Sequence, residues 1–194
     1  MLGDFVLDTC YGTSEKANSD GTGTPILRMG NIQDGRLDTR SLAYLQLDEA
    51  QRRKLVLDRG DIVVNRTNSA ELVGKCAVFD LDQEYGFASY LIRVRLDRSR
   101  ADPWLVATYI NSPIGREYMF RERKQMTGQA NVNAQKLKAL PIALPSLPEQ
   151  CRIVAYLDDL QAKVDALKAL QANSAAELDA LLPSILDKAF KGEL

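Results

Sequence analysis

The stretch from Ser146 to Gly192 carries apolar residues at alternating steps of four and three positions, interrupted by a polar gap at Gln171 and Ser174. A repeat of about 3.5 residues is the seam of a coiled coil, and it is narrower than the apolar stripe of a helix packed on a globular core. It predicts one helix approaching roughly 40 residues, or about 60 Å. The seam residues, predicted to form a dimer interface, are Ile153, Leu157, Leu160, Val164, Leu167, Leu178, Leu181 and Ile185.

Local signals mark the beginning of this helix and a weak point within it. Ser146 and Glu149 have the spacing of a capping box, and Pro148 falls in the first turn, where its missing N–H is tolerated. Pro183 removes one helical hydrogen bond and crowds the preceding turn, so a kink or a restart is expected there. A seam of this length needs a second helix. Dimerisation or docking on another long helix is expected, and folding back onto the chain's own globular part is the alternative.

The composition of the whole chain is that of a globular protein. Of the 194 residues, 45% are hydrophobic and 26% are charged, so a core can be buried. This length fits a domain over residues 1–145 and a helix over residues 146–194. No apolar run approaches the ~18 residues of a membrane span, and the N-terminus lacks the pattern of a signal peptide. The expected location is therefore cytoplasmic, without membrane contact.

The residue types of common catalytic and metal sites are scarce in this sequence. It has no histidine, and its three cysteines, Cys10, Cys76 and Cys151, are widely spaced. A zinc site and a histidine-dependent nucleophile are therefore not expected. No glycine-rich loop that would cradle a phosphate is present. We therefore predict no catalytic residue, metal or cofactor. The alternative, an independent nuclease or methyltransferase, would depend on the carboxylates of the chain, and these form no recognisable acid–base pair.

Strand and helix patterns follow one another irregularly before the long helix, which predicts an α+β domain. The segment Tyr90–Leu96 alternates apolar and polar residues and predicts a half-exposed strand, with Arg93 and Arg95 facing solvent. Helix starts are predicted from capping residues and prolines at Asp48, Asp102, Pro113 and Asn133.

Two clusters of amide and hydroxyl side chains are candidates for DNA contact. The first, Asn65–Ser69, directly follows a predicted buried strand, and the second lies in a predicted loop near residue 130. Arginine can donate two hydrogen bonds to O6 and N7 of guanine, asparagine can form two hydrogen bonds with N6 and N7 of adenine, and hydroxyls suit phosphates. The alternative is a pair of solvated turns that cap their own backbone. The candidates are Arg66, Thr67, Asn68, Ser69, Lys75, Gln129, Asn131 and Asn133, together with Thr13 and Lys16 from an N-terminal loop.

Overall charge gives no signal for nucleic acid. The net charge is −1, and residues 148–194 hold five basic and eight acidic side chains, which leaves 20 basic and 18 acidic in residues 1–147. Any contact with DNA must come from local clusters. One such cluster is the basic side of the helix predicted after Pro113, for which a simply solvated face is the alternative; it consists of Arg116, Arg121, Arg123 and Lys124.

Similarity to a known family is carried by four segments distributed between residue 60 and residue 194, namely Gly60–Lys75, Gly128–Asn133, Leu140–Val154 and Ala189–Leu194. They resemble the specificity (S) subunit of Type I restriction–modification systems. The first resembles the middle of that family's target-recognition domain, and the second fits the loop before its junction. The third resembles the junction between the recognition domain and a spacer helix, and the fourth resembles the usual C-terminal signature.

The resemblance implies a non-catalytic subunit that reads double-stranded DNA and recruits two modification subunits. Those partners hold S-adenosylmethionine and methylate adenine, and a restriction subunit adds cleavage. A typical S subunit has two recognition domains and two spacer helices, whereas this sequence has one of each. We therefore expect a homodimer that reads a bipartite palindromic site. A coiled-coil adaptor whose nearly neutral head binds protein rather than DNA is the alternative.

Overall fold

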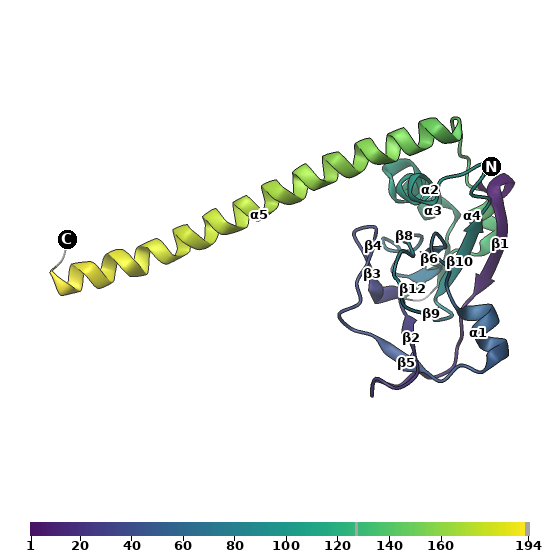
Figure 1. Ribbon diagram of the computed structural model, residues 1–194, viewed down its shortest axis with the longest axis horizontal. Coiled ribbons are helices and arrows are strands. Elements are labelled where there is room, and N and C mark those ends of the chain that lie inside the picture. The colour runs from purple at the N-terminus through teal and green to yellow at the C-terminus, as the bar shows by residue number, and fades with distance from the viewer. Residues whose placement is uncertain (127, 193–194) are drawn as a thin grey trace. The chain divides into compact units, whose positions relative to one another are not determined.

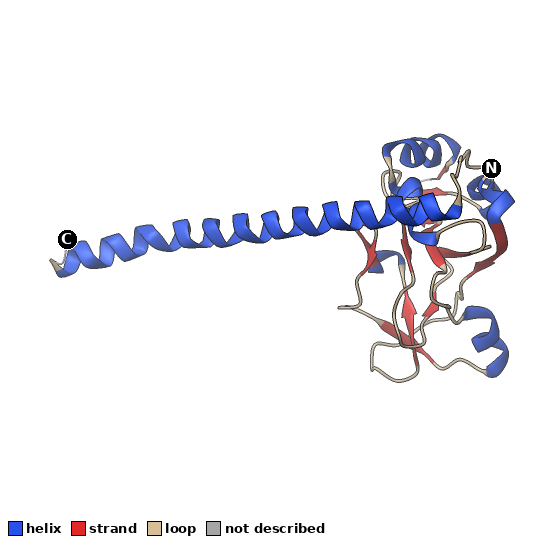
Figure 2. Ribbon diagram, turned by 45° about the horizontal axis from the view of Figure 1, so that its top comes forward, coloured by secondary structure: helices blue, strands red, loops and turns tan. Residues whose placement is uncertain are grey.

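The fold is mixed α/β with a long C-terminal helix, which confirms the predicted fold class (Figures 1 and 2). The computed structural model describes residues 1–126 and 128–192, so Glu193 and Leu194 of the C-terminal signature lie outside the described residues. The chain divides into two compact units, Met1–Cys151 and Arg152–Leu194, here termed the head and the tail.

A four-stranded antiparallel sheet forms the centre of the head. Its strands, in the order β1-β10-β6-β8, are β1 (Val6–Tyr11), β10 (Leu91–Leu96), β6 (Ile62–Asn65) and β8 (Cys76–Val78). Because successive side chains of a strand point to opposite faces, Val64 joins one core cluster and its neighbour Val63 joins another. Both faces of this sheet are therefore buried.

Three smaller sheets extend the head. The first, β5-β2-β9, contains β5 (Ala43–Leu45), β2 (Thr24–Leu27) and β9 (Gly86–Phe87). The second is the pair of β3 (Ile32–Gln33) and β4 (Arg36–Leu37). The third, β11-β12-β7, contains β11 (Lys124–Met126), β12 (Gln129–Asn131) and β7 (Thr67–Asn68).

The helices of the head begin where capping residues and prolines predicted them. The Asp48 side chain accepts from the Gln51 N–H, and the Asp102 side chain caps the next helix in the same way. These helices are α1 (Glu49–Leu55), α2 (Pro103–Asn111), α3 (Pro113–Glu122) and α4 (Ala134–Lys138), with short 3-10 helices η1 (Leu2–Phe5) and η2 (Met29–Asn31). Residues of α2 and α3 complete the first core cluster, and Leu55 of α1 joins the second.

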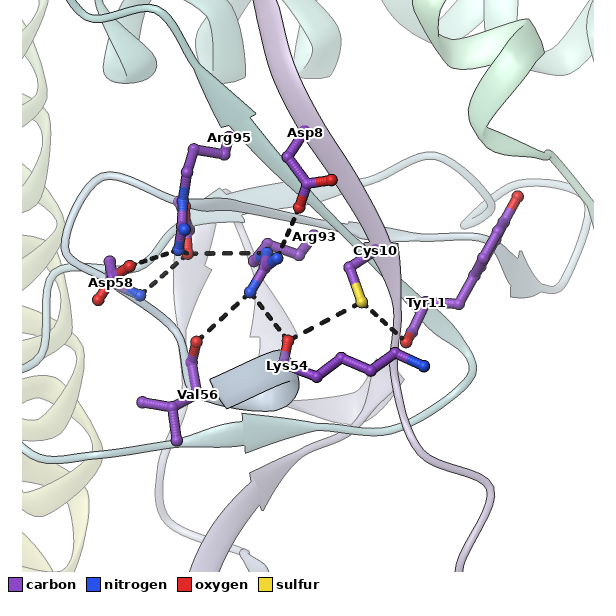
Figure 3. A network of polar contacts seen from close by, with 9 residues as sticks. Asp8, Cys10, Tyr11, Lys54, Val56, Asp58, Arg93 and Arg95 are labelled. Atoms are coloured by element: carbon purple, nitrogen blue, oxygen red, sulfur yellow. Dashed lines mark hydrogen bonds and ion pairs between the residues drawn. The ribbon is translucent and has the colours of Figure 1, made fainter. Parts of the chain in front are cut away.

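The expectation that Arg93 faces solvent is wrong, because the residue is only 6% exposed. Alternation predicts an exposed side chain only where one face of a sheet is solvated, and here a second core covers that face. Arg93 donates from Nη2 to Asp8 Oδ2 at 2.6 Å and from Nη1 to the Lys54 carbonyl at 3.0 Å (Figure 3). The same network contains Arg95, whose pKa is raised by its hydrogen bond to the buried carboxylate of Asp61. It ties β1 to the end of α1 and to the start of β6.

The long helix α5 (Leu147–Lys191) has 45 residues and continues through Pro183. Of the predicted kink or restart at that proline, the restart is wrong. A single proline removes one hydrogen bond, and the helix continues beyond it to Lys191. Its first turn belongs to the head, where Gln150 is completely buried. None of the described helices is long and apolar enough to cross a membrane.

Candidate nucleic-acid interface

Strand pairing brings together the two polar clusters singled out from the sequence. β12 pairs with β7 in antiparallel register, with Asn131 opposite Thr67 and Ala130 opposite Asn68. The Asn131 Nδ2 group donates to Thr67 Oγ1 at 2.8 Å across 64 residues of sequence. Both clusters were predicted as loops, and sequence reasoning did not find their pairing, because strands of two or three residues show no readable period.

Arg66 lies where this small sheet meets the central one. Its N–H donates to the Tyr90 carbonyl, and its carbonyl accepts from Val132 N–H, at 2.9 and 2.8 Å. The guanidinium carbon stands 4.6 Å from the centroid of the Tyr11 ring, within the range of a cation–π contact. Tyr11 was not among the predicted site residues. The signal for it in the sequence is its place at the start of the polar N-terminal loop that also holds the predicted residues Thr13 and Lys16.

The register of the central sheet places these groups at one end of it. Tyr11 is the last residue of β1 and pairs with Ile92, while Asn65 is the last residue of β6 and pairs with Leu91. Tyr11, Arg66 and Tyr90 therefore flank neighbouring strand ends, and both tyrosines are exposed. An aromatic and cationic edge of this kind is suited to the base edges of nucleic acid.

Thr13 reaches the same end of the sheet through its backbone. It forms a bridge with Ala88, and its carbonyl accepts from Ser89 N–H at 2.7 Å. Gly12 permits this approach, because a Cβ there would stand 2.2 Å from the Phe87 carbonyl oxygen. The predicted residue Lys16 is exposed in the loop that follows.

Several predicted residues have roles within the fold instead. Asn133 caps α4 by accepting from Lys136 N–H at 2.9 Å, and the Asn68 side chain accepts from Ser69 N–H at 2.8 Å. Gln129 is exposed at the start of β12. Lys75 precedes β8, and desolvation lowers its pKa, an effect that the charge of Asp34 opposes.

The predicted basic helix face is only partly available to a ligand. Arg116 donates to the backbone carbonyls of Val73 and Glu71, and Arg123 lies over the Phe120 ring at 3.3 Å from its centroid. Arg121 is exposed in α3, and Lys124 is exposed at the start of β11. Half of this group is therefore committed to packing, and the face is a weaker candidate than the Arg66 edge.

A family model described as the Type I restriction modification DNA specificity domain matches residues 2–177. The StySPI specificity subunit of Salmonella potsdam is 31% identical over 195 residues, an alignment that covers 100% of this chain and 42% of that protein. The EcoKI specificity subunit of Escherichia coli K12 is 33% identical over 186 residues, which cover 94% of this chain and 40% of that protein.

Solved structures agree with these sequence matches. A chain from a study of complex assembly and conformational transition of the type I R-M system superposes with a TM-score of 0.75 at 29% identity, over 100% of this chain and 45% of that one. The HsdS subunit from Thermoanaerobacter tengcongensis superposes with a TM-score of 0.65 at 28% identity, over 100% of this chain and 44% of that one. This chain thus spans less than half the length of these relatives.

Proposed function

This chain belongs to the Type I restriction–modification DNA specificity family, and from that premise we propose that it is a non-catalytic component that reads DNA. In this proposal the head (Met1–Cys151) recognises one half of a bipartite palindromic site. The tail pairs two copies and recruits modification subunits, which carry S-adenosylmethionine and methylate adenine. A restriction subunit completes the assembly that cleaves DNA.

The observation that carries the proposal is the convergence at one end of the central sheet. Residues from three separate stretches of sequence meet there, namely Tyr11 from β1, Arg66 beside β7 and Asn131 from β12. Specific readout requires several side chains held together on a firm support, and the buried sheet provides it. The remaining predicted contacts, including Lys16 and Gln129, surround this edge in the proposal as supporting groups.

The tail supports the second part of the proposal. Its seam residues beyond the first turns are exposed, with exposed fractions of 60% for Leu167 and 67% for Leu178. An apolar row of this length needs a partner helix. A second copy supplies one, and two heads related by a twofold axis then read a site whose halves are related by the same axis.

Selection from a randomised DNA library tests this function. The chain is co-expressed with modification subunits, incubated with duplexes of random sequence, and the bound DNA is sequenced. The expected result is a motif of two symmetric parts separated by a fixed spacer, with affinity that falls as salt rises. Arg66→Ala should lower the enrichment of the motif. Arg53→Ala, which changes an exposed residue of α1, should leave the enrichment unchanged. A complex that enriches no sequence, or whose affinity ignores salt, would contradict the proposal and favour the protein-binding adaptor.

A further inference from the structure

Arg66 differs from the other buried or half-buried arginines of the head. Within the described part of the chain, its guanidinium makes no hydrogen bond or ion pair. Its Nε is buried without a hydrogen-bond partner, a feature that it shares with the Nε of Arg93. Arg93, Arg95 and Arg116, in contrast, all donate to carboxylates or backbone carbonyls. A guanidinium has five donors, and buried donors are rarely left unpaired. The two terminal nitrogens of Arg66, which are not among the buried unpaired atoms, are therefore the donors that a ligand can use.

Tyr11 holds this arginine from one side. Its ring lies against the guanidinium carbon at 4.6 Å from the centroid. The ring is itself fixed at two points, because the backbone of Tyr11 is paired with Ile92 in the central sheet and its hydroxyl accepts from Ala134 N–H at 3.0 Å. A platform anchored at both ends restricts the plane of the group stacked on it.

We propose that Tyr11 is a positioning residue that fixes the guanidinium of Arg66 for two-pronged contact with a guanine in the major groove of the DNA. This inference rests on the proposed function and adds one base of the half-site to it. Tyr11 acts through Arg66 and does not itself specify the base. One G·C pair in each half of the recognised site follows directly from this assignment.

The choice of guanine over phosphate follows from which nitrogens are available. Burial removes Nε, so contact must come from the two terminal nitrogens, which form the fork that matches O6 and N7 of guanine. The neighbouring polar groups are less free, since Asn131 donates to Thr67 within the sheet. A half-buried arginine held in one plane suits a base edge, whereas phosphate contacts need no such fixed orientation.

The test compares four variants with the wild-type chain in complex with modification subunits. The probe is the duplex that the wild-type complex selects from a random library, together with duplexes carrying each single-base change. Tyr11→Leu removes the stacked ring, and Tyr11→Phe keeps the ring but loses the hydroxyl that accepts from Ala134 N–H. Arg66→Lys keeps the charge and loses the fork, and Arg66→Ala removes both. Thermal melting of each variant verifies that the head remains folded.

The expected result is a loss of discrimination at one G·C position only. Arg66→Lys and Arg66→Ala should reduce the preference for guanine there by about tenfold or more. Tyr11→Leu should reduce it in the same position, and Tyr11→Phe, which loses only the hydroxyl anchor of the ring, should reduce it by less. Preferences at the other positions should stay as in the wild type, which a general loss of folding would not produce.

Two results would overturn the inference while leaving the proposed function in place. One is a Tyr11→Leu complex that reads the selected motif unchanged. The other is an Arg66→Ala complex that binds all sequences more weakly by the same factor, with its salt dependence reduced by about one ion, which is the behaviour of a phosphate contact. A wild-type complex that enriches no motif would remove the proposed function, and this inference with it.

Discussion

Arg93 shows at the level of one residue how burial decides what an ion pair contributes. Its side chain is 7% exposed and is bonded to Asp8 and to two backbone carbonyls. Replacing a buried, hydrogen-bonded charge leaves its partners unpaired, at a cost of about 3–5 kcal/mol. Because Asp8 is half exposed, we expect Arg93→Met to lower the free energy of unfolding by about 3 kcal/mol, measured by chemical denaturation.

Arg53 provides the matched control for that measurement. It also pairs with a carboxylate, that of Glu49, but both side chains are more than three-quarters exposed. Exposed pairs contribute about 0–1 kcal/mol, so Arg53→Met should leave the unfolding midpoint almost unchanged. Equal losses in the two variants would contradict the structural role assigned to the Arg93 network.

Cys76 links the stability of the head to alkaline pH. It is completely buried, and desolvation raises the pKa of its thiol to about 12 from an ordinary value of 9.0. A group whose folded pKa is raised stabilises the fold below its unfolded pKa, and that contribution is lost as pH rises from about 9 towards about 12. Stability of the wild-type chain should therefore fall over this window. In Cys76→Ala, whatever its stability at neutral pH, the fall should be shallower, as denaturation at a series of pH values would measure.

Residue types in the candidate site could be predicted from the sequence, but their surroundings could not. Arg66 and Asn131 were identified because their side chains match base edges. Tyr11 was not included in the predicted set, because its contact with Arg66 joins residues 55 positions apart and no local pattern encodes that stacking. Arg93 was misplaced because periodicity reveals two faces of a strand and does not reveal that both are covered.

At the scale of elements, the first turn of α5 depends on Gln150. This residue is completely buried, its Oε1 accepts from Asp102 N–H at 2.8 Å, and its Nε2 donates to the carbonyls of Arg100 and Pro145. Replacing Gln150 by alanine leaves one backbone N–H and two backbone carbonyls without their hydrogen-bond partner. Each such loss costs about 1–3 kcal/mol when the group is buried.

We therefore expect Gln150→Ala to lower the free energy of unfolding of the head by about 3 kcal/mol or more. Gln161→Ala is the matched control, because Gln161 is exposed in the same helix and lies outside the seam, and alanine favours helix slightly. Urea denaturation followed by circular dichroism measures both. A Gln150→Ala chain as stable as the control would show that these three hydrogen bonds do not support the fold.

Elements with strong local signals were predictable, and elements made by long-range pairing were not. α5 follows from its repeat, and α1 to α4 follow from capping residues and prolines. β7 and β12 are two and three residues long and exist because they pair with each other. The supporting surface of the candidate site is therefore a product of tertiary structure.

At the scale of the whole molecule, the proposed function requires two heads and hence a partner for the tail. The apolar seam of α5 is largely exposed in the single chain, with Val164 at 43% and Leu181 at 52%. Relatives more than twice as long as this chain belong to the same family. A second copy of the chain supplies a comparable length of polypeptide, which explains why dimerisation and DNA reading are proposed together.

Leu167→Asp tests the dimer directly. The seam position becomes charged in both protomers, because a twofold interface repeats each change. Each leucine contributes about 1.5–3 kcal/mol on burial, so association should weaken by roughly a hundredfold or more. The wild-type chain should have twice the 21.6 kDa mass of a protomer by light scattering, and Leu167→Asp should have the protomer mass. Ala169→Asp, on the side of the helix away from the seam, should remain dimeric. A wild-type chain at protomer mass would mean that the tail does not pair two copies, and the palindromic site would lose its basis.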